Sequence, residues 1–164
     1  MTVLVVFAHP MQESFNHAVF DTVLRVVRSH EPGADVVDLY RRAPASVTAT
    51  ADPDEIVDTV VLVYPTWWTA QPALLWQWLL DRDASTWTGV NRVVCVTTHG
   101  GKRVAAVLAG RTGRFALRSL LRDAAHHPIA LCWIPVYGLD ASDASDRERM
   151  LRQVESKVSQ VLSA

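Results

Sequence analysis

Three short segments of the 164-residue chain place polar or aromatic side chains directly after apolar runs. The first, residues 9–16, links the run 2–8 to a helical pattern that begins at Ser14. A helix N-terminus presents free N–H groups and the positive end of the helix dipole, which suits a phosphate. Ser14, Asn16 and His9 would add side-chain donors. The alternative is a capped helix that binds no ligand.

The second segment, residues 65–72, holds Trp67 and Trp68 between two prolines. Adjacent tryptophans in a loop are not typical core residues, and their flat rings suit stacking against a planar ligand. We expect one of the two instead to anchor the loop to the core. The third segment, residues 97–101 (TTHGG), combines hydroxyls, a titratable histidine and two glycines that let a ligand approach the backbone. A plain turn is the alternative there.

These segments require elements that bring them together. Five short apolar runs alternate with helical patterns, which predicts an α/β fold with a parallel sheet covered on both faces. We expect the strand order 2-1-3-4-5, in which ligands bind where the order reverses, at the carboxyl ends of the strands. The predicted strands are 2–8, 34–39, 59–64, 91–97 and 129–137. The predicted helices begin near Ser14, Pro53, Pro72, Gly113 and a capping box formed by Ser145 and Glu148.

Taken together, the three segments resemble the flavodoxin-like NAD(P)H:quinone oxidoreductases, including the small bacterial members. The first family motif, His-x-x-x-x-Ser-Phe-Asn, is matched by His9, Ser14, Phe15 and Asn16. The second and most specific motif is matched by Pro65, Trp68, Pro72, Ala73, Trp78, Asp81 and Arg82. The third is matched by Thr97, Thr98, Gly100 and Gly101. The resemblance implies one flavodoxin-like, three-layer domain over residues 1–164.

The sequence departs from the family pattern at three points. The lysine of the second motif is replaced by apolar or polar residues at 75–77, and His99 separates the threonines from the glycines of the third. Well-studied animal members carry a tyrosine and a histidine that hydrogen-bond the flavin or substrate, but no tyrosine directly follows Gly101 here. His99 is therefore the available substitute, and the alternative is an ordinary loop histidine.

The resemblance implies a flavin that takes a hydride from NAD(P)H, the co-substrate, and passes two electrons to a quinone or a similar aromatic acceptor. We expect FMN, with FAD as the alternative, because a short chain leaves little room for an adenine site. His99 and Trp68 are the candidate catalytic residues. The candidate cofactor-binding residues are His9, Ser14, Phe15, Asn16, Pro65, Thr66, Trp67, Trp68, Thr97, Thr98, His99, Gly100 and Gly101.

Composition narrows the class of protein. A net charge of −1 argues against nucleic-acid binding and against a strongly acidic electron carrier. No apolar run is long enough to span a bilayer, so we expect no membrane insertion. Cys95 and Cys132 lie in apolar runs, which indicates buried thiols of a cytoplasmic protein. No cluster of His, Cys or acidic residues has metal-ligand spacing, so we expect no metal.

The helical pattern over residues 73–80 is apolar nearly all round, so we expect a second surface to cover it. Because members of the family are dimers with active sites at the subunit interface, we expect a homodimer. The alternatives are a flavodoxin-like electron carrier and a regulatory subunit of a potassium-efflux system. A tailoring reductase for a natural product is a further alternative, which the sequence does not distinguish from a general quinone reductase.

Overall fold

The computed structural model describes residues 2–41, 57–67, 70–82, 84–104 and 112–164. Five parallel strands form one sheet in the order β2-β1-β3-β4-β5, which confirms the predicted topology. The three central strands are almost entirely buried, whereas the two edge strands are more exposed. The strands are β1 (Val3–Phe7), β2 (Asp35–Asp38), β3 (Thr59–Pro65), β4 (Arg92–Thr98) and β5 (Ala130–Val136).

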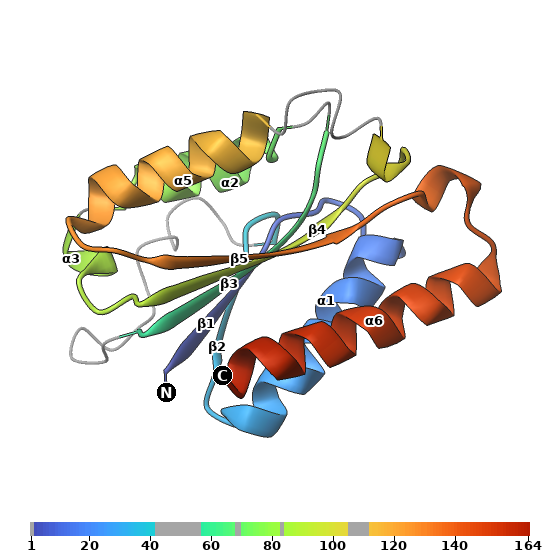
Figure 1. Cartoon of the computed structure of the whole chain (residues 1–164), viewed down its shortest axis with the longest axis horizontal. Coiled ribbons are helices and arrows are strands. Elements are labelled where there is room, and N and C mark those ends of the chain that lie inside the picture. Colours follow the sequence, from blue (N-terminus) through green and yellow to red (C-terminus); the bar gives the residue numbers. More distant parts are fainter. Residues whose placement is uncertain (1, 42–56, 68–69, 83, 105–111) are drawn as a thin grey trace.

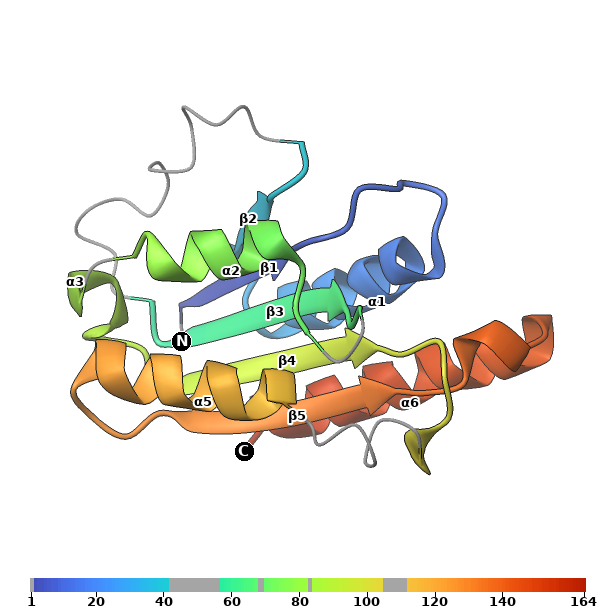
Figure 2. The same ribbon diagram turned by 90° about the horizontal axis from the view of Figure 1, so that it is seen from above.

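Helices cover both faces of this sheet (Figures 1 and 2). α1 (Phe15–His30) and α6 (Ala144–Leu162) lie on one face, and α2 (Ala73–Leu80) and α5 (Thr112–Ala125) lie on the other. The short helices α3 (Ala84–Trp87) and η2 (Leu139–Ala141) complete the described elements. The helix predicted to begin at Pro53 lies outside the described residues. No helix in the described part of the chain is both long and apolar enough to cross a lipid bilayer.

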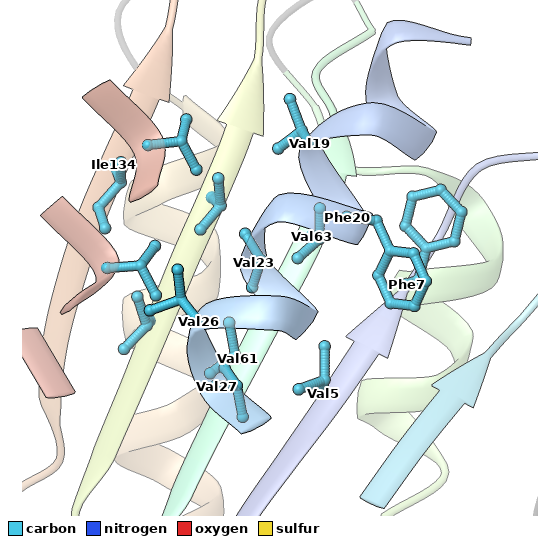
Figure 3. Packing of buried hydrophobic residues seen from close by; sticks show 14 of the residues in the cluster. Val5, Phe7, Val19, Phe20, Val23, Val26, Val27, Val61, Val63 and Ile134 are labelled. Carbon is cyan, nitrogen blue, oxygen red and sulfur yellow. The ribbon is translucent and has the colours of Figure 1, made fainter. Parts of the chain in front are cut away.

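The core beneath α1 explains why the segment 9–16 has a fixed position (Figure 3). Val19 and Val23 recur at helical spacing and are fully buried. They pack in one cluster with Val5 of β1 and Val61 of β3. Burying such a side chain contributes about 1.5–3 kcal/mol, so α1 is held against β1 and β3 along its length.

Capping side chains set the starts of the two long helices. Ser14 caps α1 as predicted, because its hydroxyl accepts from the backbone N–H of His17. The capping box predicted for Ser145 and Glu148 is wrong. Asp143 accepts from the backbone N–H of Asp146, whose carboxylate accepts in turn from the N–H of Asp143. Asp143 and Ser145 are both residue types that cap helices, and the helix begins directly after the earlier of the two.

One side of α2 is buried and the other is exposed, although both are apolar. Leu75, Trp78 and Leu79 face the core, and Trp78 is only 3% exposed beneath the guanidinium of Arg82. Leu74 and Leu80, by contrast, are 43% and 56% exposed. The unmatched apolar surface of α2 is therefore made of leucines rather than tryptophans.

Candidate functional site

The segments that follow β1, β3 and β4 meet at the carboxyl edge of the sheet, where the strand order reverses. The backbone N–H of Thr66 donates to the carbonyl of Thr98 at 2.8 Å, which ties the second segment to the third. The rings of His9 and Trp67 lie 6.4 Å apart between centroids, which brings the first segment beside the second. Such a switch point is where ligands bind in doubly wound α/β sheets.

In the first segment, Nδ1 of His9 accepts from the backbone N–H of Met11 at 3.2 Å. Nδ1 also lies 3.1 Å from the carbonyl of Met11 and 3.1 Å from the hydroxyl of Ser14, whereas Nε2 has no partner among the described residues. The hydroxyl of Ser14 donates to the carbonyl of Met11 at 2.9 Å and accepts from the N–H of His17. His9 therefore keeps one ring nitrogen for a ligand, whereas the proton of Ser14 is used within the loop.

The start of α1 also leaves donors open. Within the described structure, the backbone N–H groups of Phe15 and Asn16 donate to no other group. Asn16 is buried, and its Oδ1 accepts from the hydroxyl of Thr98 at 2.5 Å. Because Oδ1 is used in this bond, the NH₂ group of Asn16 is available as a further donor, and it has no partner among the described residues. An anion at this helix start would meet several aligned N–H groups.

The second segment presents one exposed aromatic ring at the site. Trp67 is 43% exposed, and its backbone pairs with Ala70 through hydrogen bonds of 2.9 and 3.0 Å that close a tight turn. Because the N–H groups of Thr66 and Trp67 are both bonded within the protein, a ligand would meet the side chains here. Trp68, predicted to be catalytic, lies outside the described residues.

In the third segment, hydroxyl groups hold the ring of His99. Oγ1 of Thr66 lies 3.0 Å from Nδ1, and Oγ1 of Thr97 lies 3.2 Å from Nε2. The hydroxyl of Thr66 donates to the carbonyl of Thr98, so it can only accept from His99, and it lies within reach of both ring nitrogens, at 3.0 Å from Nδ1 and 3.2 Å from Nε2. Burial lowers the pKa of His99, so the ring is neutral at pH 7. To bind a ligand, His99 would replace its hydrogen bond to Thr66 or Thr97 with one to the ligand.

The glycines of the third segment have a structural reason that the sequence did not indicate. A Cβ on Gly100 would come within 2.5 Å of the carboxylate of Asp140, so η2 packs closely against this turn. The carbonyls of Gly100 and Gly101 accept from the N–H groups of Asp140 and Gly138. The N–H groups of both glycines have no described partner, and they remain free to donate to a ligand.

One residue at the site was missed in the sequence. The ring of Tyr137 stacks on the ring of His99, with the centroids 4.6 Å apart. The family pattern points to a tyrosine after Gly101, whereas Tyr137 directly follows β5, whose carboxyl end reaches the same edge of the sheet. The side chain of Phe15 packs on the core, and Pro65 ends β3 in a buried position.

Comparison with known proteins agrees with this architecture. A family model described as the flavodoxin-like fold matches residues 1–161. The chain belongs to this family. A search of curated protein sequences found no significant match.

Three solved structures share this fold. The NAD(P)H:quinone oxidoreductase from Methanothermobacter marburgensis is 20% identical, with 98% of this chain and 96% of that chain covered and a TM-score of 0.72. An FMN-dependent NADH-azoreductase from Bacillus anthracis, solved in complex with FMN, is 12% identical, with 99% and 98% covered and a TM-score of 0.68. An oxidoreductase from Corynebacterium diphtheriae is 17% identical, with 99% and 96% covered and a TM-score of 0.66. The predicted resemblance is thus confirmed, and identities this low show the shared fold.

Proposed function

We propose that this protein is a flavin-dependent NAD(P)H oxidoreductase that reduces quinones or similar electron-poor aromatic compounds. The observation that carries the proposal is the set of backbone N–H groups at one edge of the sheet that have no partner among the described residues. Phe15 and Asn16 contribute two at the start of α1, and Gly100 and Gly101 contribute two after β4. The exposed ring of Trp67 lies beside His9 at the same edge. A phosphate at one end and a polar planar ring at the other would match this arrangement.

The residues present fit a flavin. His9, Ser14, Phe15 and Asn16 would hold its phosphate, with Nε2 of His9 and the NH₂ of Asn16 as the side-chain groups that face it. When bound, the flavin accepts a hydride from NAD(P)H and returns two electrons to the acceptor. The residues proposed to surround the ring are Pro65, Thr66, Trp67, Trp68, Thr97, Thr98, His99, Gly100 and Gly101.

We assign the control of one proton to His99. Overall, NAD(P)H and one proton convert a quinone to a hydroquinone and NAD(P)⁺. His99 is neutral at pH 7, so it has one ring proton to donate, and the hydroxyl of Thr66 at Nδ1 is a partner that a ligand could displace. Tyr137 covers one face of the imidazole and keeps its orientation. Thr97 holds the other nitrogen, so the ring is positioned before a ligand arrives.

The cofactor that we propose is FMN, with FAD as the alternative, bound by one domain over residues 1–164. The solved azoreductase that contains FMN supports the choice, since this chain covers 98% of it and the two are of similar size. The test is to purify the protein, release its flavin by denaturation and identify it by mass. FMN alone supports the proposal, FAD alone replaces the cofactor, and a protein that neither carries nor takes up flavin rejects the proposed function.

We further propose a cytoplasmic homodimer. α2 and α5 lie on the same face of the sheet (Figure 2). Leu74 and Leu80 of α2 and the 64% exposed Phe115 of α5 are apolar side chains that a second copy would bury. Cys95 and Cys132 are both free thiols, which suits a reducing compartment that also supplies NAD(P)H.

A further inference from the structure

A cavity of about 620 Å³ lies at the open edge of β5. Its lining comes from Trp133 and Pro135 of β5, Arg114 of α5 on one face of the sheet, and Lys157 of α6 on the other. We call it the β5-edge cavity. Thr66, His99 and Tyr137 also line it, so the cavity is continuous with the proposed flavin site. Its volume is typical of sites that bind small molecules.

The backbone groups along the open edge of β5 suit the binding of a small molecule rather than pairing with an additional strand. The N–H of Ala130 and the carbonyl of Val136 both bond toward β4, so the residues between them alternate in direction. Trp133 and Pro135 therefore direct their backbone groups outward. Proline has no N–H, which interrupts the pairing that another strand would need. The N–H of Trp133 remains available as a donor at the edge.

The charge of the β5-edge cavity is strongly one-sided. Arg103, Arg114 and Lys157 line it without an ion pair to any residue in the described ranges, whereas Arg149 is paired with Asp146. No aspartate or glutamate occurs among the described residues of the lining. Three unpaired cations around one cavity attract an anion, and they lower the affinity for a cationic ligand.

Aromatic rings line the same space. The guanidinium of Arg114 lies 5.9 Å from the centroid of the Trp133 ring, and Tyr64 meets Trp133 edge-on at 6.4 Å. The hydroxyl of Tyr64 is buried beside Gln71 and forms no hydrogen bond of good geometry in the described structure. The side-chain N–H of Gln71 donates to the carbonyl of Gly113 at 2.6 Å, and the amide oxygen has no hydrogen bond to the part of the chain that the structure describes. Rings, polar groups and cations together suit a planar molecule with an anionic substituent.

We propose that the β5-edge cavity binds aromatic compounds that carry a carboxylate or sulfonate, and that such compounds are the preferred electron acceptors. The second half of this inference rests on the proposed function, because it takes the flavin site to lie at the His99 end of the cavity. The anionic group lies among Arg103, Arg114 and Lys157. The ring lies toward His99 and Tyr137.

The first test measures binding without turnover. Isothermal titration of the purified protein compares naphthalenesulfonate with naphthalenesulfonamide, which has nearly the same shape and no charge. We expect the sulfonate to bind at least about tenfold more tightly, with a preference that declines as salt increases. Arg114→Gln and Lys157→Gln should each reduce this preference by about three- to tenfold. The matched controls Arg118→Gln on α5 and Arg152→Gln on α6 remove a cation from the same helices outside the cavity and should not change it.

Three outcomes would overturn the inference. The first is equal binding of the two compounds, and the second is an undiminished preference in a protein that carries both Arg114→Gln and Lys157→Gln. The third is displacement of the sulfonate by the adenosine bisphosphate fragment of NADPH with the same dependence on these cations, which would assign the cavity to the nucleotide. Circular dichroism of each variant verifies that the fold is retained.

A kinetic comparison separates this inference from the proposed function. With a sulfonated and a neutral naphthoquinone, we expect the ratio of kcat/KM values to favour the sulfonated acceptor and to fall in Arg114→Gln. Sulfonate binding in a protein that shows no reductase activity would reject the proposed function and keep the binding site. Reduction of both quinones with equal kcat/KM would keep the function and reject the preference for anionic acceptors.

Discussion

At the scale of single residues, His99 differs most from the pattern of related sequences. The hydroxyls of Thr97 in β4 and of Thr66, which directly follows β3, contact the two ring nitrogens of His99. The ring of Tyr137 stacks on the imidazole. The sequence indicated that His99 could act at the site, because it is the only titratable side chain in residues 97–101, with an ordinary loop histidine as the alternative. It could not indicate Tyr137, which lies 38 residues further along the chain and reaches the site only because β5 pairs with β4.

We predict that His99→Ala retains flavin but turns over more slowly. Loss of a positioned acid or hydrogen-bond donor usually costs about 100- to 10,000-fold at the chemical step. Stopped-flow measurements should show a larger loss in acceptor reduction than in reduction of the flavin by NAD(P)H. His30→Ala at the exposed end of α1 is the control. Wild-type rates in both half-reactions of His99→Ala would make His99 a loop residue only.

Burial of His99 also predicts how stability depends on pH. Its pKa is lowered from 6.5 by desolvation, so below about pH 6.5 the unfolded chain takes up a proton that the folded chain resists. The free energy of unfolding should therefore fall as the pH drops from 6.5 toward the folded pKa. Urea denaturation should show a weaker decline in His99→Gln. An identical pH dependence in wild type and variant would contradict the burial of this ring.

At the scale of elements, the structure agrees with the sequence wherever hydrophobic periodicity was strong. The strands of valine-rich runs and the long helices α1 and α6 lie within one or two residues of their predicted bounds. The start of α6 was wrong by a short distance because Asp143 and Ser145 are both good N-caps. Contacts between elements were not predictable, since Asn16 and Thr98 are 82 residues apart and nothing local marks them as partners.

The Asn16–Thr98 bond joins α1 to β4, and we predict that it couples their stability. Asn16→Ala leaves the buried hydroxyl of Thr98 without its acceptor and should cost about 1–3 kcal/mol of unfolding free energy. In a protein that already carries Thr98→Val, Asn16→Ala should cost less unfolding free energy than it does alone, which corresponds to a coupling energy of about 1 kcal/mol. Thr22→Val, another buried threonine, is the control and should add to Asn16→Ala without coupling. Strict additivity of Asn16→Ala and Thr98→Val would contradict the bond.

At the scale of the whole molecule, the apolar surface on α2 predicts assembly. Leu74→Glu combined with Leu80→Glu places charge on the proposed interface and should give monomers with reduced activity. Trp78 is unsuitable for this test because it faces the core, and a charge there would unfold the domain. Ser156→Glu with Gln160→Glu on the exposed side of α6 is the matched control. Light scattering that finds a monomeric wild type at micromolar concentration would contradict the dimer.

The central claim is that this edge of the sheet holds a flavin that NAD(P)H reduces by two electrons. Anaerobic titration of the flavin-loaded protein with NAD(P)H, followed by its visible spectrum, tests this claim most directly. We predict that one equivalent of NAD(P)H removes the absorbance of the oxidised flavin in a single step, and that added quinone restores it. A flavin that NAD(P)H does not reduce, or that accumulates in a stable half-reduced state as in an electron carrier, would contradict the account.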